Sequence, residues 1–212
     1  MKIILTGATG YVGEGVLLAC LENENVEKVL SLSRRSTGRK DVKLEEYIVP
    51  DFMQLQLGDE KLQGYDAVFY CAGSSSVGMS QEQYKINCHD VPLHLAQVVK
   101  PKENMTIIFM SGAGTDLPLA RAKVKRSTAQ ALSKMGFKQT FGYRAGLMKP
   151  LEGQINRPNM IKATNSTYKI ARFFCMGNTM ENVAKSMIAA TKFGYKKQKI
   201  QIRDIDILAE KL

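Results

Sequence analysis

Short apolar runs alternate along the chain with longer segments in which apolar residues recur at helical spacing. The apolar runs predict strands at 2–6, 28–33, 46–49, 66–71, 105–111, 138–143 and, near the end, 198–202. Helices are expected near 12–23, 80–99, 119–135, 167–175 and 179–193, with a short one at the terminus. Such alternation is typical of a parallel sheet covered by helices on both faces.

Three segments depart from this alternation. Pro92 interrupts the 80–99 helix, so a kink or a late helix start is expected there. The segment 53–63 is short and its pattern is ambiguous, and residues 149–168 are irregular, as a substrate-side loop would be. No repeat or linker divides the 212 residues. We therefore expect a single domain, in which residues 147–212 supply that loop and the closing helices.

Three glycines follow the first predicted strand with the spacing GxxGxxG, namely Gly7, Gly10 and Gly13. A pyrophosphate binds well at a helix N-terminus, where backbone N–H groups and the helix dipole favour negative charge. Glycines permit the tight turn, the close approach of backbone to phosphate and the close packing of the helix on the sheet. Three neighbouring residues are expected around the phosphates: Thr9, Tyr11 and Val12.

The second predicted strand ends in Ser33, Arg34 and Arg35, without the acidic residue that NAD-binding proteins usually place there. A carboxylate would repel a 2′-phosphate, whereas guanidinium groups bind it through charge-assisted hydrogen bonds. The sequence therefore favours NADP(H) over NAD(H). Arg39 and Lys40, a few residues later, are interpreted as an exposed basic turn.

The third and fourth predicted strands also end in residues suited to a nucleotide. Asp51 is placed to accept a hydrogen bond from the adenine amine, with Phe52 beside the ring. Cys71, Ala72 and Gly73 are small enough for backbone to run along a ribose. Because a doubly wound sheet binds its ligand at the carboxyl ends of its strands, these residues are expected in one pocket.

Composition narrows the function classes. The net charge of +10 is spread along the chain without aromatic interleaving, so it is attributed to solvated surface and to attraction for an anionic cofactor, not to nucleic-acid binding. No apolar stretch approaches the roughly 18 residues that span a bilayer, and the N-terminus lacks a signal-peptide layout, so no membrane association is expected.

The four cysteines and two histidines do not form a metal-binding pattern. His89 and His94 are five residues apart, which places them on different faces of a helix. The cysteines contain no CxxC pair and are interpreted as buried thiols in a reducing cytoplasm: Cys20, Cys71, Cys88 and Cys175. No metal ion and a cytoplasmic location are therefore expected.

The order of the motifs is more specific than any one of them. TGATGYVG, SRR, DF, CAG and MSGAG, followed by a VK-bearing helix and YRAG, resemble the atypical short-chain dehydrogenase/reductase superfamily. Its small NAD(P)-binding branch similar to the Tat-interacting protein, with bacterial epimerase/dehydratase-like members, shares the closing TMENVAKSMI and IRDIDILA. The resemblance runs from Met1 to about Leu208. It implies a doubly wound Rossmann fold with a mostly parallel sheet and a short C-terminal extension, NADPH binding, and catalysis by Ser, Tyr and Lys.

The resemblance assigns Ser111 and Lys125 to the catalytic serine and lysine, but Arg121 stands at the tyrosine position. A guanidinium stays protonated, so it cannot replace the phenol as an acid, although it can bind an oxyanion or a carboxylate. Arg121 and Lys125 share a helix face and can form a cationic pair above the cofactor. Alternatively, Arg121 and Lys123 face solvent and only Lys125, which would also contact the cofactor, faces inward.

Two other features depart from the family pattern. Tyr195 and Lys199 form a YxxxK, but they lie beyond the last long helix and are interpreted as a coincidence. Ala145 stands where the family has a proline after YR, which bears on the loop toward the substrate side. Tyr143, expected near the pocket rim, is a substitute candidate for the missing proton donor.

Three functions remain compatible with these residues. The first is an NADPH-dependent reductase of a small carbonyl, quinone or flavin-like substrate, with protons from Ser111, Arg121 or water. The second is a non-catalytic NADPH-binding sensor or regulatory protein. The third, sugar-nucleotide epimerisation, normally needs the missing tyrosine and a larger C-terminal domain, and ranks last. The substrate stays open, as does a homodimer or protein partner.

Overall fold

The computed structural model describes residues 1–73, 79–156 and 177–212. Within these ranges, seven strands form one sheet in the order β3-β2-β1-β4-β5-β6-β9, and each neighbouring pair is parallel. The strands are β1 (Lys2–Thr6), β2 (Lys28–Ser33), β3 (Leu44–Ile48), β4 (Ala67–Tyr70), β5 (Thr106–Met110), β6 (Gln139–Tyr143) and β9 (Lys199–Ile200). The predicted doubly wound α/β Rossmann fold is confirmed.

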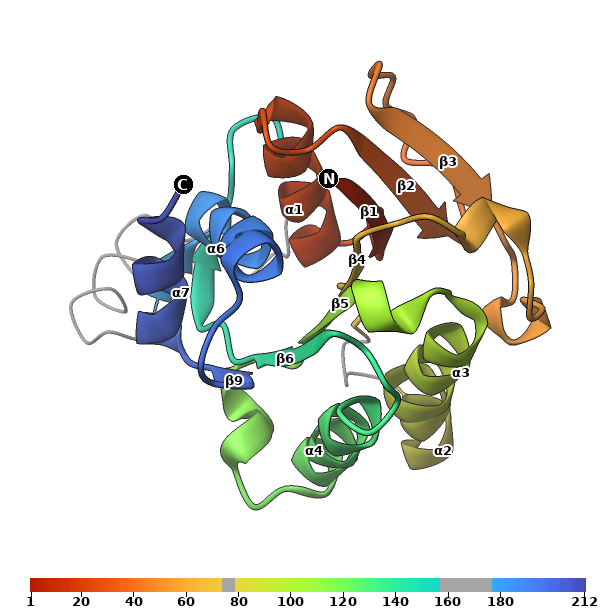
Figure 1. Cartoon of the computed structure of the whole chain (residues 1–212). Helices are drawn as coiled ribbons and strands as arrows, with labels where there is room; N and C mark the ends of the chain where they lie inside the picture. The colour runs from red at the N-terminus through yellow and green to blue at the C-terminus, as the bar shows by residue number, and fades with distance from the viewer. Residues whose placement is uncertain (74–78, 157–176) are drawn as a thin grey trace.

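Helices cover both faces of this sheet (Figure 1). On one face lie α1 (Tyr11–Glu22), α6 (Met180–Phe193) and α7 (Ile202–Ala209); on the other lie α2 (Gln81–Lys85), α3 (Val91–Val98) and α4 (Ala120–Leu132). Side chains alternate along β1, so that Ile3 and Leu5 pack in the core under α1 and α6, whereas Ile4 packs in the core under α3. Burying each such side chain contributes about 1.5–3 kcal/mol.

Strand β3 begins at Leu44, two residues before the predicted start. It pairs in parallel with β2 alone, so it forms the edge of the sheet. Glu45 is exposed and forms an ion pair with Lys28, and this polar position hid the start of the strand from the hydrophobic pattern.

The predicted 80–99 helix is interrupted as expected. A π-helical turn at Ile86–Asp90 separates α2 from α3, and Pro92 stands in the first turn of α3. Proline has no N–H to donate back along the helix, so the turn before it departs from α geometry. The ambiguous 53–63 segment forms two 3₁₀ turns, η1 (Phe52–Gln54) and η2 (Glu60–Leu62).

A second, small sheet follows Gly146 and was not predicted. It pairs β7 (Leu147–Lys149) with β8 (Gly177–Thr179) in parallel. Residues 157–176 lie outside the described residues, and with them the helix predicted at 167–175 and most of the irregular loop predicted at 149–168. Among the helices that the structure describes, none has the length and apolar character needed to span a bilayer.

Candidate functional site

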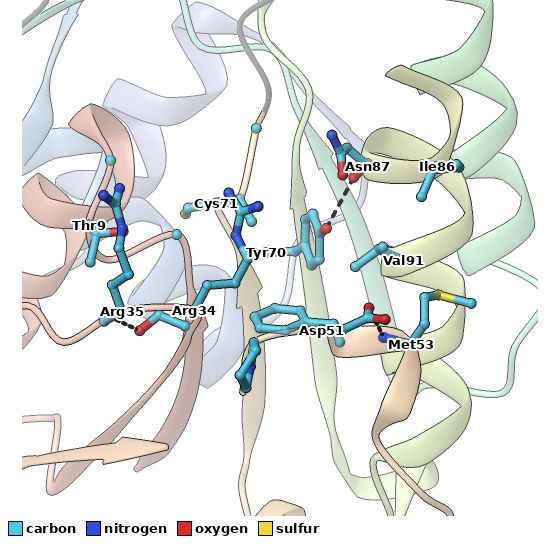
Figure 2. A pocket seen from close by; sticks show the side chains of 17 residues that line it. Thr9, Arg34, Arg35, Asp51, Met53, Tyr70, Cys71, Ile86, Asn87 and Val91 are labelled. Carbon is cyan, nitrogen blue, oxygen red and sulfur yellow. Dashed lines mark hydrogen bonds between the residues drawn. The ribbon is translucent and has the colours of Figure 1, made fainter. Parts of the chain in front are cut away.

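The carboxyl ends of β1, β2, β3 and β4 surround a cavity of about 360 Å³ (Figure 2). It lies where the strand order reverses between β1 and β4, which is the place where doubly wound sheets bind ligands. The cavity brings together most of the predicted cofactor residues: Gly7, Thr9, Gly10, Ser33, Arg34, Arg35, Asp51, Phe52, Cys71, Ala72 and Gly73.

The glycines of the β1–α1 turn form a cradle that side chains would fill. Gly7 has φ +76°, and a Cβ there would lie 2.6 Å from the backbone nitrogen of Ala72. A Cβ on Gly13 would overlap the Gly7 carbonyl oxygen. Gly10 is the N-cap of α1 and provides no side-chain cap. The backbone N–H groups at this helix N-terminus are therefore available to bind an anion. The turn therefore fits a pyrophosphate.

The two residues after Gly10 offer this cradle their backbone only. The Tyr11 hydroxyl donates a 2.5 Å hydrogen bond to the Met148 carbonyl, and Val12 packs against the core under α1. Neither side chain lines the cavity, in contrast to Thr9. The sequence predicted all three around the phosphates, but only Thr9, which precedes the helix, lines the cavity.

Arg34 and Arg35 are exposed, and neither guanidinium has a hydrogen bond or ion pair with a described residue. Figure 2 shows Arg35 extending toward Thr9 and Arg34 toward Cys71. Ser33 fixes the start of this loop, because its hydroxyl donates a 2.6 Å hydrogen bond to the Arg35 carbonyl. Two unpaired cations therefore face the cavity, as expected for a phosphate site.

Glu46, on the edge strand, fixes the rest of the loop. Its carboxylate accepts hydrogen bonds from the Ser36 hydroxyl and the Thr37 amide, both at 2.6 Å, and from the Thr37 hydroxyl at 2.8 Å. Partial burial raises the pKa of Glu46, but these hydrogen bonds outweigh it and lower that pKa below the ordinary value. These bonds connect the loop that presents the arginine pair to the edge strand.

The interpretation of Arg39 as an exposed basic residue is wrong, although Lys40 is exposed as expected. The Arg39 guanidinium forms a 2.5 Å ion pair with Glu14 and donates a 2.8 Å hydrogen bond to the Gly153 carbonyl. Glu14 and Gly153 are distant from this loop in sequence, so no local pattern marked the contact.

The far end of the cavity combines predicted and unexpected residues. Phe52 lines it, and Asp51 lines it while its carboxylate caps η1 through the Met53 amide at 2.9 Å. Asn87 and Val91, from the π-helical turn and α3, complete this wall and were missed by the sequence reasoning. The interrupted helix before Pro92 was the available signal, because π-turns often occur at functional sites.

At the end of β4, backbone and small side chains line the cavity. The Ala72 amide donates a 3.2 Å hydrogen bond to the Thr6 hydroxyl, which ties β4 to β1. Cys71 is buried, and burial raises the pKa of its thiol. Cys20 and Cys88 are also buried free thiols, and burial raises the pKa of Cys20 to about 12. Cys175 lies outside the described residues.

Ser111, at the end of β5, is buried, and its hydroxyl is engaged. It donates a 2.8 Å hydrogen bond to the Tyr143 carbonyl and accepts one from the Arg144 guanidinium. A hydroxyl has a single hydrogen, so in this geometry Ser111 has none to offer a substrate oxygen.

Arg144, within the YRAG motif, was not singled out from the sequence. Its side chain is buried and lies 3.6 Å from Asp116, which in turn pairs with Lys199 at 3.2 Å. Burial lowers the pKa of Arg144, and the Asp116 carboxylate opposes that shift. A buried guanidinium needs such partners, and Ser111 is one of them.

Lys125 faces inward, as one of the two interpretations expected. Its ammonium donates a 3.0 Å hydrogen bond to the Ser111 carbonyl, and within the described residues it contacts no carboxylate. Burial lowers the pKa of Lys125; the nearby Cys88 thiol raises it, and the Arg144 guanidinium lowers it further. Lys123, two residues earlier, is exposed.

Arg121 follows neither interpretation. Its guanidinium lies 5.3 Å from the ring centre of Tyr84 on α2 and donates a 3.1 Å hydrogen bond to the Met79 carbonyl. It therefore packs against α2 and the residue Met79 before it, instead of pairing with Lys125 or extending into solvent. Tyr84 is buried beneath it.

Neither Tyr143, the substitute candidate, nor Tyr195 of the YxxxK lines the cavity. Tyr143 has no exposed surface and packs in the core under α6, beside the Ser186 hydroxyl, rather than near a pocket rim. Tyr195 donates a hydrogen bond to Asp204 at 2.9 Å, whereas Lys199 pairs with Asp116. Their different partners agree with a coincidental YxxxK.

The cradle, the strand order and the cavity at the switch point together describe a nucleotide-binding Rossmann domain. Residues 3–128, more than half of the chain, match the model of the NAD dependent epimerase/dehydratase family. The chain belongs to this family. It has an NAD(P)-binding, epimerase/dehydratase-like fold, and the predicted short-chain dehydrogenase/reductase relationship is confirmed.

Two curated proteins similar in sequence to this chain are named as mitochondrial. Protein fmp52 of Emericella nidulans is 24% identical over 182 residues, which cover 82% of this chain and 74% of that protein. FMP52 of Saccharomyces cerevisiae is 29% identical over 160 residues, covering 73% and 67%. These names contradict the predicted cytoplasmic location. Unpaired thiols exclude only an oxidising compartment, so they could not identify the cytoplasm among the reducing ones.

Solved epimerases share the fold. The UDP-glucuronic acid 4-epimerase of Bacillus cereus, solved in complex with NAD, has a TM-score of 0.68 at 15% identity, and the match covers 95% of this chain and 76% of that one. At this identity the likeness extends to the fold alone.

Proposed function

We propose that this protein is an NADP(H)-dependent oxidoreductase that reduces an acceptor needing little acid assistance, such as a quinone, a flavin or a small activated carbonyl. The observation that carries the cofactor choice is the pair Arg34 and Arg35 at the end of β2. Both guanidinium groups line the cavity without a partner among the described residues, and the end of β2 carries no carboxylate. A 2′-phosphate would satisfy them through charge-assisted hydrogen bonds.

The acceptor class follows from the missing proton donors. Arg121 replaces the tyrosine and packs on Tyr84, while the only hydrogen of the Ser111 hydroxyl is bonded to the Tyr143 carbonyl. A positioned acid typically contributes about 10²–10⁴-fold to the rate, which an unactivated ketone would need. Bound NADPH supplies a hydride. Quinones and flavins accept one readily and take their proton from water.

Lys125 supports a catalytic or binding role at the β5 end. Its side chain is partly buried, it contacts no carboxylate among the residues that the structure describes, and the Arg144 guanidinium lies near enough to lower its pKa. Such a placement disfavours the charged form and costs stability. Perturbed groups of this kind occur most often at functional sites. We assign Lys125 to the nicotinamide end of the cofactor.

A non-catalytic NADPH sensor is the second candidate. It is favoured by the hydrogen bonds that already engage the Ser111 hydroxyl. It would use the cavity and the arginine pair without any acceptor. Sugar-nucleotide epimerisation has less support, because it depends on the tyrosine that Arg121 replaces.

A cofactor and acceptor screen tests the proposal. Calorimetry with NADPH and NADH measures binding, and the loss of reduced-nicotinamide absorbance measures turnover with quinones, flavins, aldehydes and unactivated ketones. We expect NADPH to bind more tightly than NADH and to be oxidised by at least one quinone or flavin, with ketones inert. Tight NADPH binding without turnover on any acceptor would favour the sensor. Equal binding of both nucleotides would reject the NADP(H) assignment.

A further inference from the structure

Glu14, on the cofactor-binding helix α1, is a buried carboxylate whose donors all come from other parts of the chain. The side chain is 2% exposed. It accepts hydrogen bonds from the backbone amides of Ile155, at 3.0 Å, and Asn156, at 2.7 Å, and from the Asn156 side chain at 3.1 Å. Burial raises the pKa of Glu14, but these bonds and Arg39 outweigh it and lower that pKa. The carboxylate therefore stays ionised and holds the chain that follows β7.

Arg39 completes the contact from the other side. One nitrogen of its guanidinium contacts the Glu14 carboxylate at 2.5 Å and the Gly153 carbonyl at 2.8 Å. The Arg39 amide also donates a 3.3 Å hydrogen bond to the Thr37 hydroxyl, and Thr37 is fixed by Glu46. The loop that carries the arginine pair thus ends in a residue that contacts both α1 and the 150–156 segment.

Further bonds connect the same segment to α1. The Gln154 side chain donates a 2.8 Å hydrogen bond to the Tyr11 carbonyl and accepts one from the Leu151 amide at 2.8 Å. Gly15 allows this approach, because a Cβ there would lie 2.8 Å from the Gln154 side-chain oxygen. The first turns of α1 therefore border the nucleotide cavity on one side and contact the 150–156 segment on the other.

We propose that Glu14 and Arg39 are positioning residues that couple occupancy of the Arg34–Arg35 phosphate site to the placement of the 150–156 segment. A phosphate held by Arg34 and Arg35 restrains the loop at one end, and Arg39 transmits that restraint from the other. NADH, which lacks the 2′-phosphate, restrains the loop less. By reciprocity, a well-placed segment also strengthens NADPH binding. This inference rests on the proposed function, because it requires NADPH at the arginine pair.

Hydrogen exchange at the Ile155 and Asn156 amides tests the coupling directly, without any substrate. In the wild-type protein we expect saturating NADPH to slow exchange at these amides at least about 5-fold more than saturating NADH does. Arg39→Met removes the bridge, so both nucleotides should then have the same effect. Lys40→Met, an exposed cation beside Arg39, is the matched control and should behave like the wild type.

The outcomes separate this inference from the proposed function. If calorimetry shows tight NADPH binding but the two nucleotides protect these amides equally in the wild type, the coupling is wrong and the cofactor assignment stands. If NADPH does not bind, the cofactor assignment and the coupling both fail. A nucleotide difference that persists in Arg39→Met would also overturn the role of Arg39.

Steady-state kinetics with a quinone acceptor distinguishes positioning from general destabilisation. We expect Glu14→Gln and Arg39→Met to raise the KM for the acceptor about 10-fold while kcat changes less, since the coupling energy is typically about 1–3 kcal/mol. Arg39→Lys should recover part of the loss, because one ammonium can contact both Glu14 and Gly153. Glu22→Gln, an exposed carboxylate on the same helix, is the control. An unchanged acceptor KM in Arg39→Met, or no rescue by Arg39→Lys, would contradict the positioning role.

Discussion

The two halves of the site differ in the chemical groups that they offer a ligand. Around the ends of β1 to β4, the ligand would meet mainly backbone, glycine and two arginines that have no partner in the described part of the chain, in a cavity of about 360 Å³. Around the ends of β5 and β6, Ser111 and Lys125 bond to neighbouring protein groups, and neither residue lines that cavity. The first region keeps the family arrangement, and the second departs from it.

The difference shows that a fold can keep the backbone features that suit a nucleotide while the side chains available for acid catalysis change. Phosphate recognition by a turn and a helix N-terminus uses main-chain groups that every sequence possesses, provided that glycine allows the geometry. Acid catalysis needs a particular side chain with a free proton at one atom. Arg121 in place of tyrosine, together with Arg144 beneath Ser111, changes the second region without disturbing the sheet.

The largest effect is expected from Gly13→Ala, which changes the β1–α1 turn in the first region. A Cβ at this position overlaps the Gly7 carbonyl, so the helix has to move away from the turn. We expect a loss of about 3 kcal/mol or more in the free energy of unfolding and no measurable binding of either nucleotide. Urea denaturation and calorimetry measure the two effects. Gly114→Ala, where the nearest atom would be 3.9 Å away, is the control. Normal affinity in Gly13→Ala would show that this turn is not the phosphate cradle.

The second prediction separates the two nucleotides. Replacing both Arg34 and Arg35 by alanine removes charge-assisted hydrogen bonds that contribute about 1.5–3 kcal/mol each. The dissociation constant for NADPH should rise about 10²-fold, and that for NADH should stay nearly constant. Calorimetry with both nucleotides measures this, with Lys40→Ala as the exposed control. Equal losses would mean that the arginine pair does not contact the 2′-phosphate.

The third prediction addresses Ser111 in the second region. Because its hydroxyl bonds to Arg144 and Tyr143, Ser111→Ala should leave a buried guanidinium nitrogen without an acceptor and reduce the free energy of unfolding by about 1–3 kcal/mol. The kcat with a quinone should change less than the roughly 10²-fold expected for loss of an acid. Ser127→Ala, on the exposed side of α4, is the control for both measurements. A large loss of kcat with unchanged stability would restore Ser111 as a catalytic residue.

The smallest expected effect is the change in the free energy of unfolding when Lys125 is replaced, and its sign is the point of interest. The folded pKa of Lys125 lies below the ordinary value of 10.5, chiefly because of burial, so the ammonium destabilises the fold at neutral pH. That penalty disappears as the pH rises through the folded pKa toward 10.5. Lys125→Met should therefore stabilise the protein slightly at pH 7, by less than about 1 kcal/mol because partial exposure screens the charge. The Ser111 carbonyl keeps the Thr115 hydroxyl as a donor at 2.7 Å.

Urea denaturation between pH 7 and pH 10 checks this prediction. The difference between Lys125→Met and the wild type should shrink as the pH rises, whereas Lys123→Met, the exposed neighbour, should show no such trend. A destabilised Lys125→Met at neutral pH would mean that the lysine is kept for packing instead of function.

The sequence was most informative where a residue acts through its own backbone or through near neighbours. The strands β1 and β2 have the predicted bounds, and Pro92 marked the interrupted helix, because local sterics decide both features. It was least informative for paired charges. Arg39 looked like a surface cation, but its partner Glu14 is 25 residues away. The location inferred from unpaired thiols failed because redox chemistry does not distinguish one reducing compartment from another.

By itself, the sequence determined the parallel sheet, the glycine turn and the cations at the end of β2, since periodicity and glycine spacing express short-range backbone constraints. Only the tertiary structure decided which groups remain available for chemistry. Ser111 and Arg144 are 33 residues apart, and they meet because β5 and β6 pair in parallel. The Ser111 hydroxyl uses its single hydrogen in a bond to the neighbouring strand, and the sequence alone gives no sign that this proton is already bonded.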